Sequence, residues 1–343
     1  MTSIAPPRHL VVRLPNPLGD AVMAVPALRA LRSALPETRI TWAGRRAANA
    51  VLEGLPHRDD VMPLDGATAR GRAAAKQLRR LGADATLLLP GSASSAVAAH
   101  AARIPVRVGV PGDRRGWFLT HEVAPPRDPE APGKPLPRPM TEHYLDLVAP
   151  FGAVDDGRGL ELVTTSFDDE RADRRLRDVP ADAVLVGVNP GAAFGPTKVL
   201  PPAKIAEAIG ALREQVDVVP LVLCGPGEQE LGEATSDAIG DCLSVHDDVP
   251  DLGELKSLVR RCALLLSSDA GPRHVAEALG TKVVVWMGPT DPRWSAHSDA
   301  VVVRNEALPC LACHQKQCPI GLPCMNELDV HALADAAVTL LRS

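Results

Sequence analysis

Apolar runs of strand length alternate along the chain with segments whose apolar residues recur at helical spacing. In the first half these runs predict strands at 9–14, 39–44, 59–64, 83–91 and 105–110. The runs are continuous rather than alternating with polar residues, as is typical of parallel strands buried on both faces. Helical spacing follows them, beginning with 21–35. The pattern predicts a parallel sheet covered by helices.

The same alternation starts again in the second half of the chain. Residues 120–140 are rich in Pro and lack periodicity, which predicts a long surface loop. The charged region 153–180 is expected to hold the domain connection and one helix. A new strand and polar loop follow in 183–198, and then a helix over 201–215 with Pro at its start. An amphipathic helix, 327–343, closes the chain.

The length of 343 residues exceeds what one ordinary core supports, so two domains are expected. We predict an α/β fold of two facing Rossmann-like domains with parallel sheets and a central cleft. The first domain spans 1–165 and the second 166–326. One arrangement for the helix at 327–343 is packing back against the first domain.

Composition narrows the function classes. The net charge is −5 and aromatic residues make up 3% of the chain, which argues against a nucleic-acid-binding protein. No apolar run approaches the roughly 18 residues that a membrane span needs, and the N-terminal residues lack the features of a signal peptide. A cytoplasmic protein is expected, with contact to a membrane surface left open.

Ligands of open α/β sheets bind beyond the carboxyl ends of the strands. The stretch "SSDAGPRH", 267–274, turns there from strand to helix, with Gly271 in the first helical turn. A helix N-terminus offers free N–H groups and partial positive charge to a phosphate, and His274 could add a donor. Asp269 either caps this helix or accepts hydrogen bonds from sugar hydroxyls.

Three further loops carry candidate charges. In "NPGAAFGPTK" the Walker spacing fails, and Lys198 is either a point charge for a diphosphate or a solvated surface lysine. Glu228, in "GPGEQE", either binds ribose hydroxyls or starts a helix. Asp20, in "PNPLGD", is either stabilised by the dipole of the helix that begins there or acts as a general base. Gly19 lets the backbone approach a ligand closely.

Four of the seven cysteines form one group with the spacing C-x2-C-x4-C-x5-C: Cys310, Cys313, Cys318 and Cys324. Four thiolates this close could bind structural zinc or iron. Reduced thiols and a disulfide remain the alternatives. The sequence predicts a structural rather than a catalytic role for this segment.

Taken together, these stretches resemble glycosyltransferase family 9, the ADP-heptose-dependent heptosyltransferases, and the four-cysteine stretch is similar to that of the lipopolysaccharide heptosyltransferase II branch. The resemblance covers about residues 9–340. Its motifs are "LPNPLGDAVMAVPALRALR", "LPGSASSA" with "RVGVPGDRRGWFLT", "NPGAAFGPTKVLPPAKIAEAI" and, most specifically, "SSDAGPRHVAEALGTKVVVWMGPTDPRW".

The resemblance implies a GT-B fold, an inverting mechanism and no catalytic metal. It implies that the first domain binds the acceptor, with Asp20 as the base, and that the second binds an ADP-sugar. The implied donor-binding residues are Thr197, Lys198, Glu228, Asp269, Ala270, Gly271 and His274. The implied acceptor-side residues are Asn16, Gly19, Ser92, Ser95 and Arg115.

Two features depart from the family pattern. Lys198 is followed by Val-Leu-Pro rather than Arg-Trp-Pro, and Ala270 replaces a serine. The 111–140 segment also lacks a dense Lys/Arg cluster, so the expected acceptor is either a lipopolysaccharide-core-like glycan or a small natural product. The alternatives to a transferase are a sugar-nucleotide epimerase or hydrolase of the same fold, and a non-enzymatic two-domain sugar-binding protein.

Overall fold

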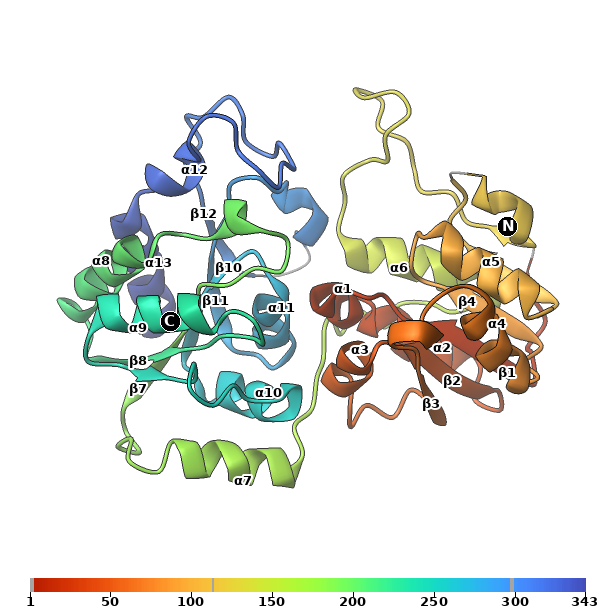
Figure 1. Ribbon diagram of the computed structural model, residues 1–343, viewed down its shortest axis with the longest axis horizontal. Coiled ribbons are helices and arrows are strands. Elements are labelled where there is room, and N and C mark those ends of the chain that lie inside the picture. Colours follow the sequence, from red (N-terminus) through yellow and green to blue (C-terminus); the bar gives the residue numbers. More distant parts are fainter. Residues whose placement is uncertain (1–2, 113, 297–298) are drawn as a thin grey trace. The chain divides into compact units, whose positions relative to one another are not determined.

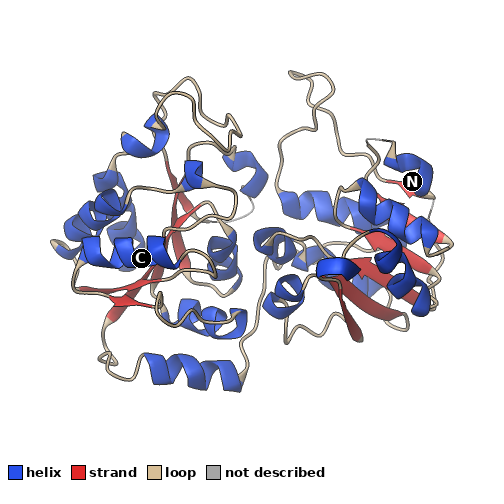
Figure 2. Ribbon diagram, in the orientation of Figure 1, coloured by secondary structure: helices blue, strands red, loops and turns tan. Residues whose placement is uncertain are grey.

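The computed structural model describes residues 3–112, 114–296 and 299–343, and it divides into two compact units, Met1–Leu162 and Val163–Ser343 (Figures 1 and 2). Each unit contains one six-stranded sheet, and the paired strands in both sheets are parallel. Each unit is described by itself below.

The strands of the first unit are β1 (His9–Arg13), β2 (Arg39–Gly44), β3 (Asp60–Pro63), β4 (Ala85–Leu88), β5 (Val106–Gly109) and β6 (His121–Glu122). Their order in the sheet is β3-β2-β1-β4-β5-β6. The central strand β1 is buried along its whole length, as its continuous apolar pattern predicts. Strand β6 corrects the expected loop 120–140: the short pairing with β5 lies at the start of that segment.

The helices of the first unit are α1 (Leu18–Met23), α2 (Val25–Ala34), α3 (Arg46–Val51), α4 (Gly71–Arg80), α5 (Ala93–Ala101) and α6 (Met140–Val148). Short 3-10 turns lie at η1 (Gly66–Thr68), η2 (Arg115–Phe118) and η3 (Ala149–Phe151). The single helix expected at 21–35 is two helices, because Pro26 lacks the N–H that a continuous helix requires and lies in the first turn of α2 instead.

The strands of the second unit are β7 (Val184–Asn189), β8 (Val218–Val222), β9 (Leu243–Ser244), β10 (Leu264–Ser268), β11 (Lys282–Trp286) and β12 (Val301–Val303). The sheet order is β12-β11-β10-β7-β8-β9. Strands β8 and β9 therefore follow β7 on one side of the sheet, and strands β10, β11 and β12 follow it on the other.

The helices of the second unit are α7 (Ser166–Arg175), α8 (Pro202–Arg213), α9 (Gln229–Ile239), α10 (Leu252–Arg261), α11 (Gly271–Ala278), α12 (Pro323–Asn326) and α13 (Val330–Arg342). The turns η4 (Pro196–Lys198) and η5 (Pro292–Ser295) lie in loops that follow strands.

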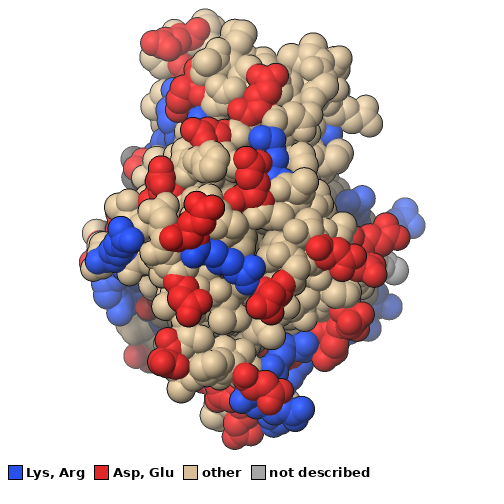
Figure 3. Space-filling view, turned by 90° about the vertical axis from the view of Figure 1, so that its left-hand side faces the viewer, with Lys and Arg blue, Asp and Glu red and all other residues tan. Residues whose placement is uncertain are grey.

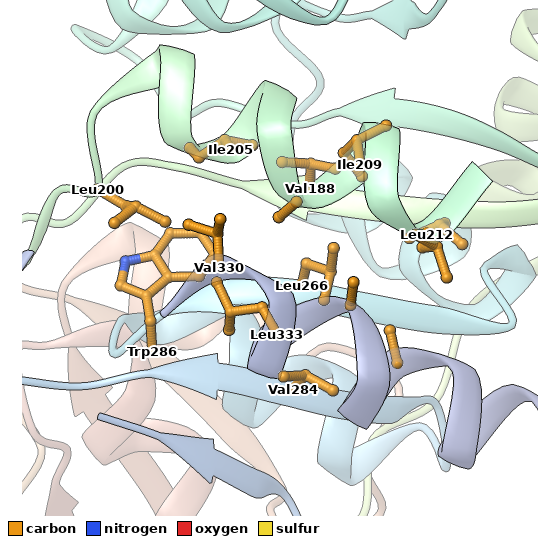
Figure 4. Packing of buried hydrophobic residues seen from close by; sticks show 14 of the residues in the cluster. Val188, Leu200, Ile205, Ile209, Leu212, Leu266, Val284, Trp286, Val330 and Leu333 are labelled. Atoms are coloured by element: carbon orange, nitrogen blue, oxygen red, sulfur yellow. The ribbon is translucent and has the colours of Figure 1, made fainter. Parts of the chain in front are cut away.

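The last helix, α13, belongs to the second unit. Figure 4 shows Val330 and Leu333 of α13 beside Trp286 of β11, with Ile205 and Ile209 of α8 across the same cluster. This packing places α13 within the compact second unit, Val163–Ser343. The apolar face of α13 is already buried against α8 and β11, where it completes one side of the sheet's core.

Figure 3 shows the charged side chains on one face of the molecule. On the face shown in Figure 3, Lys and Arg side chains alternate with Asp and Glu side chains and form no continuous basic area. Within the described part of the chain, no helix combines the length and the apolar character needed to cross a bilayer.

Candidate active site

The loops that carry the predicted donor residues meet at one edge of the second sheet. The chain order changes direction between the neighbouring strands β7 and β10, and such a switch point is where open α/β sheets bind their ligands. The loop after β7 carries Lys198, and the loop after β10 carries Asp269. The two strands are in register with Asn189 opposite Ser267, so both loops leave the sheet at the same level.

Asn189 fixes the start of the β7 loop. Its Nδ2 amide group lies 3.2 Å from the Ser267 Oγ, 3.4 Å from the Ser268 Oγ and 3.3 Å from the Gly191 carbonyl oxygen. The Ser268 hydroxyl donates to the same Gly191 carbonyl. Because all of these side chains are buried, the polar end of β10 holds the loop after β7 in one position.

Lys198 is anchored at both ends. Its backbone carbonyl accepts a hydrogen bond of 3.0 Å from the Trp286 indole, which Figure 4 shows in the core of the unit. Its ammonium lies 2.6 Å from Asp269 Oδ2 and 2.8 Å from the Asp269 carbonyl oxygen. The Phe194 ring lies 4.9 Å from the same ammonium. The reading of Lys198 as a solvated surface lysine is therefore wrong: the residue is only 9% exposed.

Asp269 is the centre of a buried charge network. One carboxylate oxygen accepts from Lys198 and from Thr290 Oγ1 at 2.6 Å, and the other lies 3.2 Å from Arg273 Nε. Burial by itself would raise the pKa of Asp269, but the charges of Arg273 and Lys198 outweigh it and lower that pKa to about 2. Asp269 is thus ionised throughout the neutral range.

Asp269 is not the helix cap that the sequence left open. The N-cap position of α11 is Ala270, and no side chain caps this helix. The helix does begin at Gly271, as predicted, so the N–H groups of its first turn carry no side-chain cap. The Asp269 carboxylate instead binds Lys198, Arg273 and the Thr290 hydroxyl.

His274 is buried rather than exposed to a ligand. Its Nδ1 lies 3.0 Å from Glu277 Oε2, and its Nε2 lies 3.4 Å from Arg273 Nε, which always donates. This geometry makes Nε2 an acceptor, so the structure does not present it as the phosphate donor expected from the sequence.

Glu228 lies against the β7 loop. Its carboxylate accepts a 3.0 Å hydrogen bond from the Gly225 backbone N–H. A Cβ at Gly191 would stand 2.4 Å from the Glu228 carboxyl carbon, so only glycine permits this approach. Glu228 thereby reaches the same sheet edge as Lys198, with a half-buried carboxylate.

The cysteine segment supports these loops from one side. The Thr197 hydroxyl donates to the Gln315 carbonyl at 2.8 Å, so in this structure its proton does not point to a donor phosphate. The His314 N–H donates to the Pro289 carbonyl at 2.7 Å, next to Thr290. The segment therefore contacts two loops: the one that carries Lys198, and the one after β11 in which Thr290 binds Asp269.

The expected metal site in this segment receives no support. In residues 3–112, 114–296 and 299–343, no group of three or more His, Cys, Asp or Glu side chains is arranged to hold a metal. The four cysteines are free thiols. Burial raises the pKa of Cys324 to about 11, and the neighbouring Cys310, Cys313 and Cys318 add to this rise.

In the first unit, Asp20 lies in the first turn of α1, after the switch-point strand β1. The buried Tyr144 of α6 lies near it: burial, and then the negative charge of Asp20, raise the pKa of the Tyr144 hydroxyl well above its usual range. The phenol stays protonated beside the carboxylate. Gly19, one residue earlier, is buried.

Arg115, one of the implied acceptor-side residues, is deeply buried in the first unit. The side chain comes from η2 and is 1% exposed. Its Nη1 donates to the Pro90 carbonyl at 3.1 Å, while Nε and Nη2 have no hydrogen-bond partner among the described residues. Burial lowers the pKa of Arg115. A buried cation with two unused donor groups is costly and calls for an explanation.

The other acceptor-side candidates follow two other strands: Asn16 follows β1, and Ser92 and Ser95 follow β4. Ser92 is the N-cap residue of α5, but its side chain makes no capping bond. Ser95 Oγ donates to the Ser92 carbonyl at 2.7 Å. Asn16 Oδ1 accepts at 3.1 Å from Arg13, a second buried arginine, which holds the loop after β1.

Comparison with known proteins identifies the family. The sequence model of glycosyltransferase family 9 (heptosyltransferase) matches residues 71–322. The chain belongs to glycosyltransferase family 9. The chain is 26% identical to lipopolysaccharide heptosyltransferase 2 of Salmonella typhimurium, over 81% of this chain and 82% of that protein. It is 23% identical to lipooligosaccharide heptosyltransferase 2 of Campylobacter jejuni, over 97% of this chain and 98% of that one.

Solved structures show the same fold. The family 9 glycosyltransferase of Veillonella parvula superposes with a TM-score of 0.81 at 20% identity, covering 98% of this chain and 97% of that one. The E. coli ADP-heptose lps heptosyltransferase II superposes with a TM-score of 0.76 at 21% identity, covering 97% and 98%. This glycosyltransferase thus has the GT-B fold.

Sequence reasoning missed two members of the network, Arg273 and Thr290. Arg273 follows Asp269 by four residues and precedes Glu277 by four, and residues at that spacing share one face of a helix. This spacing could have indicated the ion pairs. Thr290 lies 21 residues from Asp269 along the chain, and no local pattern indicates such a contact.

Proposed function

We propose that this glycosyltransferase transfers a heptose, or a related sugar, from an ADP-sugar to an acceptor hydroxyl with inversion and without a catalytic metal. The acceptor is either a lipopolysaccharide-core-like glycan or a small natural product. The observation that carries the proposal is the buried Lys198 beside the uncapped start of α11, at the switch point of the second sheet. Membership of a heptosyltransferase family supports the choice of donor.

The donor-side roles follow from charge. Lys198 is a compact cation, and the α11 N-terminus at Gly271 supplies backbone N–H groups, so together they suit a diphosphate. The half-buried Glu228, at the end of the neighbouring strand, suits the ribose hydroxyls. Asp269 holds Lys198 in place until the diphosphate arrives, and Ala270, at the N-cap position, places no capping side chain on the helix start.

The acceptor-side roles rest on the first unit. Asp20 is the proposed general base, and the protonated Tyr144 lies near its carboxylate. Arg115 offers two unused N–H groups to polar oxygens of the acceptor. The backbone at Gly19 and the side chains of Ser92, Ser95 and Asn16 complete the proposed acceptor surface on the same sheet edge.

The reaction is a single displacement. The acceptor oxygen attacks the anomeric carbon and forms the new C–O bond, while the bond from that carbon to the β-phosphate oxygen breaks. Asp20 takes the acceptor proton, and ADP leaves with the bonding electron pair. Lys198 and the helix N-terminus stabilise the charge that develops on the departing diphosphate, which is the work that a metal ion performs in other transferases.

Calorimetric titration with ADP, UDP and GDP tests the donor assignment. We expect ADP to bind most tightly, and Lys198→Ala to weaken it by about tenfold to a hundredfold because a charged contact is lost. Lys204→Ala, on the same side of the sheet but bonded to the Leu328 carbonyl, is the matched control. Unchanged ADP affinity in Lys198→Ala would remove this residue from the donor site.

A transfer assay with ADP-heptose tests the base. Asp20→Asn should lower turnover by about 10²–10⁴-fold and leave ADP affinity within twofold of the wild type. The product's anomeric configuration reports inversion, and turnover in EDTA tests metal independence. Retention, or turnover abolished by EDTA and restored by a divalent cation, would contradict the proposed mechanism.

A further inference from the structure

Arg273 belongs to the Asp269 network but has no role yet in donor binding, although it is one of the most completely buried side chains among the described residues, with 0% exposure. Its Nε lies 3.2 Å from Asp269 Oδ1, and its Nη1 lies 3.8 Å from Glu277 Oε1. Its Nη2 is buried and has no hydrogen-bond partner among the described residues. A buried donor without a partner is costly and calls for an explanation.

The two cations on Asp269 occupy different oxygens. Lys198 and Thr290 bind Oδ2, whereas Arg273 faces Oδ1. Lys198 can bind a diphosphate only if its ammonium turns away from Asp269, at least in part. A buried carboxylate that lost its sole counter-ion would be strongly destabilised, so a second, permanent cation removes an obstacle to that movement.

The unused nitrogen of Arg273 is placed for this exchange. In a planar guanidinium, Nε–H and one N–H of Nη2 lie along the same edge, where they bind both oxygens of a carboxylate. Nε lies 3.2 Å from Asp269 Oδ1, and in this state its N–H donates to His274 Nε2. Once Lys198 leaves Oδ2, rotation of the Asp269 carboxylate toward the guanidinium would offer Nη2 its missing acceptor.

We propose that Arg273 is a positioning residue that acts as the resident counter-ion of Asp269 and so allows Lys198 to turn from this carboxylate to the donor diphosphate. This inference rests on the proposed donor-binding role of Lys198. It assigns Arg273 no contact with the ligand: its effect on ADP binding passes through Asp269.

A double-mutant cycle on ADP affinity tests the assignment, with ADP itself as the probe in calorimetry. Arg273→Met should weaken ADP binding about tenfold, because Lys198 becomes the only cation on Asp269. In the Asp269→Asn background, where no carboxylate holds Lys198, the same substitution should cost less than twofold. Arg175→Met is the matched control, since it removes one of two arginines from the buried Glu254 elsewhere in the unit; ADP affinity should stay unchanged.

Two results would overturn the inference. An equal loss in both backgrounds would show that Arg273 acts on the ligand directly. No loss in the otherwise wild-type protein, where Asp269 is intact, would show that Lys198 needs no second cation. Arg273→Lys keeps the charge in case Arg273→Met does not fold; it lacks the two-nitrogen edge and should lose about threefold in ADP affinity, and full wild-type affinity counts against the role of Nη2.

Failure of the underlying donor site gives a different result. If Lys198→Ala binds ADP as the wild type does, the proposed function fails whatever Arg273 does. If Lys198→Ala weakens ADP binding and Arg273→Met does not, only the counter-ion role of Arg273 fails.

Discussion

The two units bury cations at the same edge of the same kind of sheet, but they treat the charge in opposite ways. In the second unit, Lys198 and Arg273 share the carboxylate of Asp269. In the first unit, the guanidinium of Arg115 meets one carbonyl and, among the described residues, no carboxylate.

The difference separates two ways of preparing a site for a ligand. A balanced network such as that of Asp269 is stable without a ligand, and the ligand must exchange partners with it. An unbalanced cation such as Arg115 reduces stability without a ligand, and an anionic or hydroxyl-bearing ligand gains its full set of donors. Four measurements would break or sharpen this contrast.

The largest expected effect is on the stability of the second unit. Asp269→Ala leaves two buried cations without their carboxylate, and we expect the free energy of unfolding to fall by about 3–5 kcal/mol. Chemical denaturation followed by circular dichroism measures it. Asp178→Ala, whose exposed carboxylate pairs with the exposed Arg177 in the same unit, is the control and should cost about 1 kcal/mol or less. A similarly small loss of stability in Asp269→Ala would show that the Asp269 network does not stabilise the second unit, which would contradict the contrast with Arg115.

The second effect is the acid sensitivity of that network. The pKa of Asp269 is lowered from 3.8 to about 2 in the folded protein, so the folded state binds this proton less readily than the unfolded chain. The stabilisation, about 2 kcal/mol, is therefore present above pH 4 and is lost as the pH falls from about 4 to 2.

Denaturation at a series of pH values checks this sign. Asp269→Asn should flatten the pH dependence of unfolding between pH 4 and 2 relative to the wild type. Arg115→Met should leave that slope unchanged, because an arginine does not titrate there. An identical slope in Asp269→Asn would mean that other carboxylates account for the acid sensitivity.

The third effect is a small change in the free energy of unfolding and a large loss of transfer to the acceptor. Arg115→Met removes a buried charge that lacks a carboxylate, so the free energy of unfolding should stay within about 1 kcal/mol of the wild type or rise, while transfer to the acceptor falls. Arg107→Met is the matched control: that guanidinium donates to the carbonyls of Phe118 and Pro105, and its loss should destabilise the unit without a specific loss of transfer. A clearly destabilised Arg115→Met would show that this cation is structural.

The smallest effect uses a natural probe, since all seven cysteines lie in the second unit. Burial raises the pKa of the Cys262 thiol to about 12, so it should react with a thiol reagent only after this unit opens. Asp269→Ala should speed the labelling of Cys262, and Arg115→Met should leave its rate unchanged. The exposed Cys313 serves as the internal reference, and faster labelling in Arg115→Met would show that the two units are coupled.

Local pattern determined most of the fold. The continuous apolar runs were enough to predict two parallel α/β sheets, because burial on both faces leaves a run of Val, Leu and Ala with no polar alternation. Strand β2, at 39–44, has the predicted bounds. The break between α1 and α2 and the short strand β6 were missed, because a single Pro and a two-residue pairing leave little trace in periodicity.

For the site, the sequence by itself determined which residue types stand at the carboxyl ends of the strands: Lys198, Asp269 and Gly271 in one half and Asp20 in the other. Only the tertiary structure decided that Lys198 and Asp269, 71 residues apart, form one ion pair, that Thr290 joins them, and that Arg115 has no carboxylate partner among the described residues. The physical reason is that burial and neighbouring charges set the energy and the ionisation of a charged group. The order of strands in the sheet brings together neighbours that are far apart along the chain.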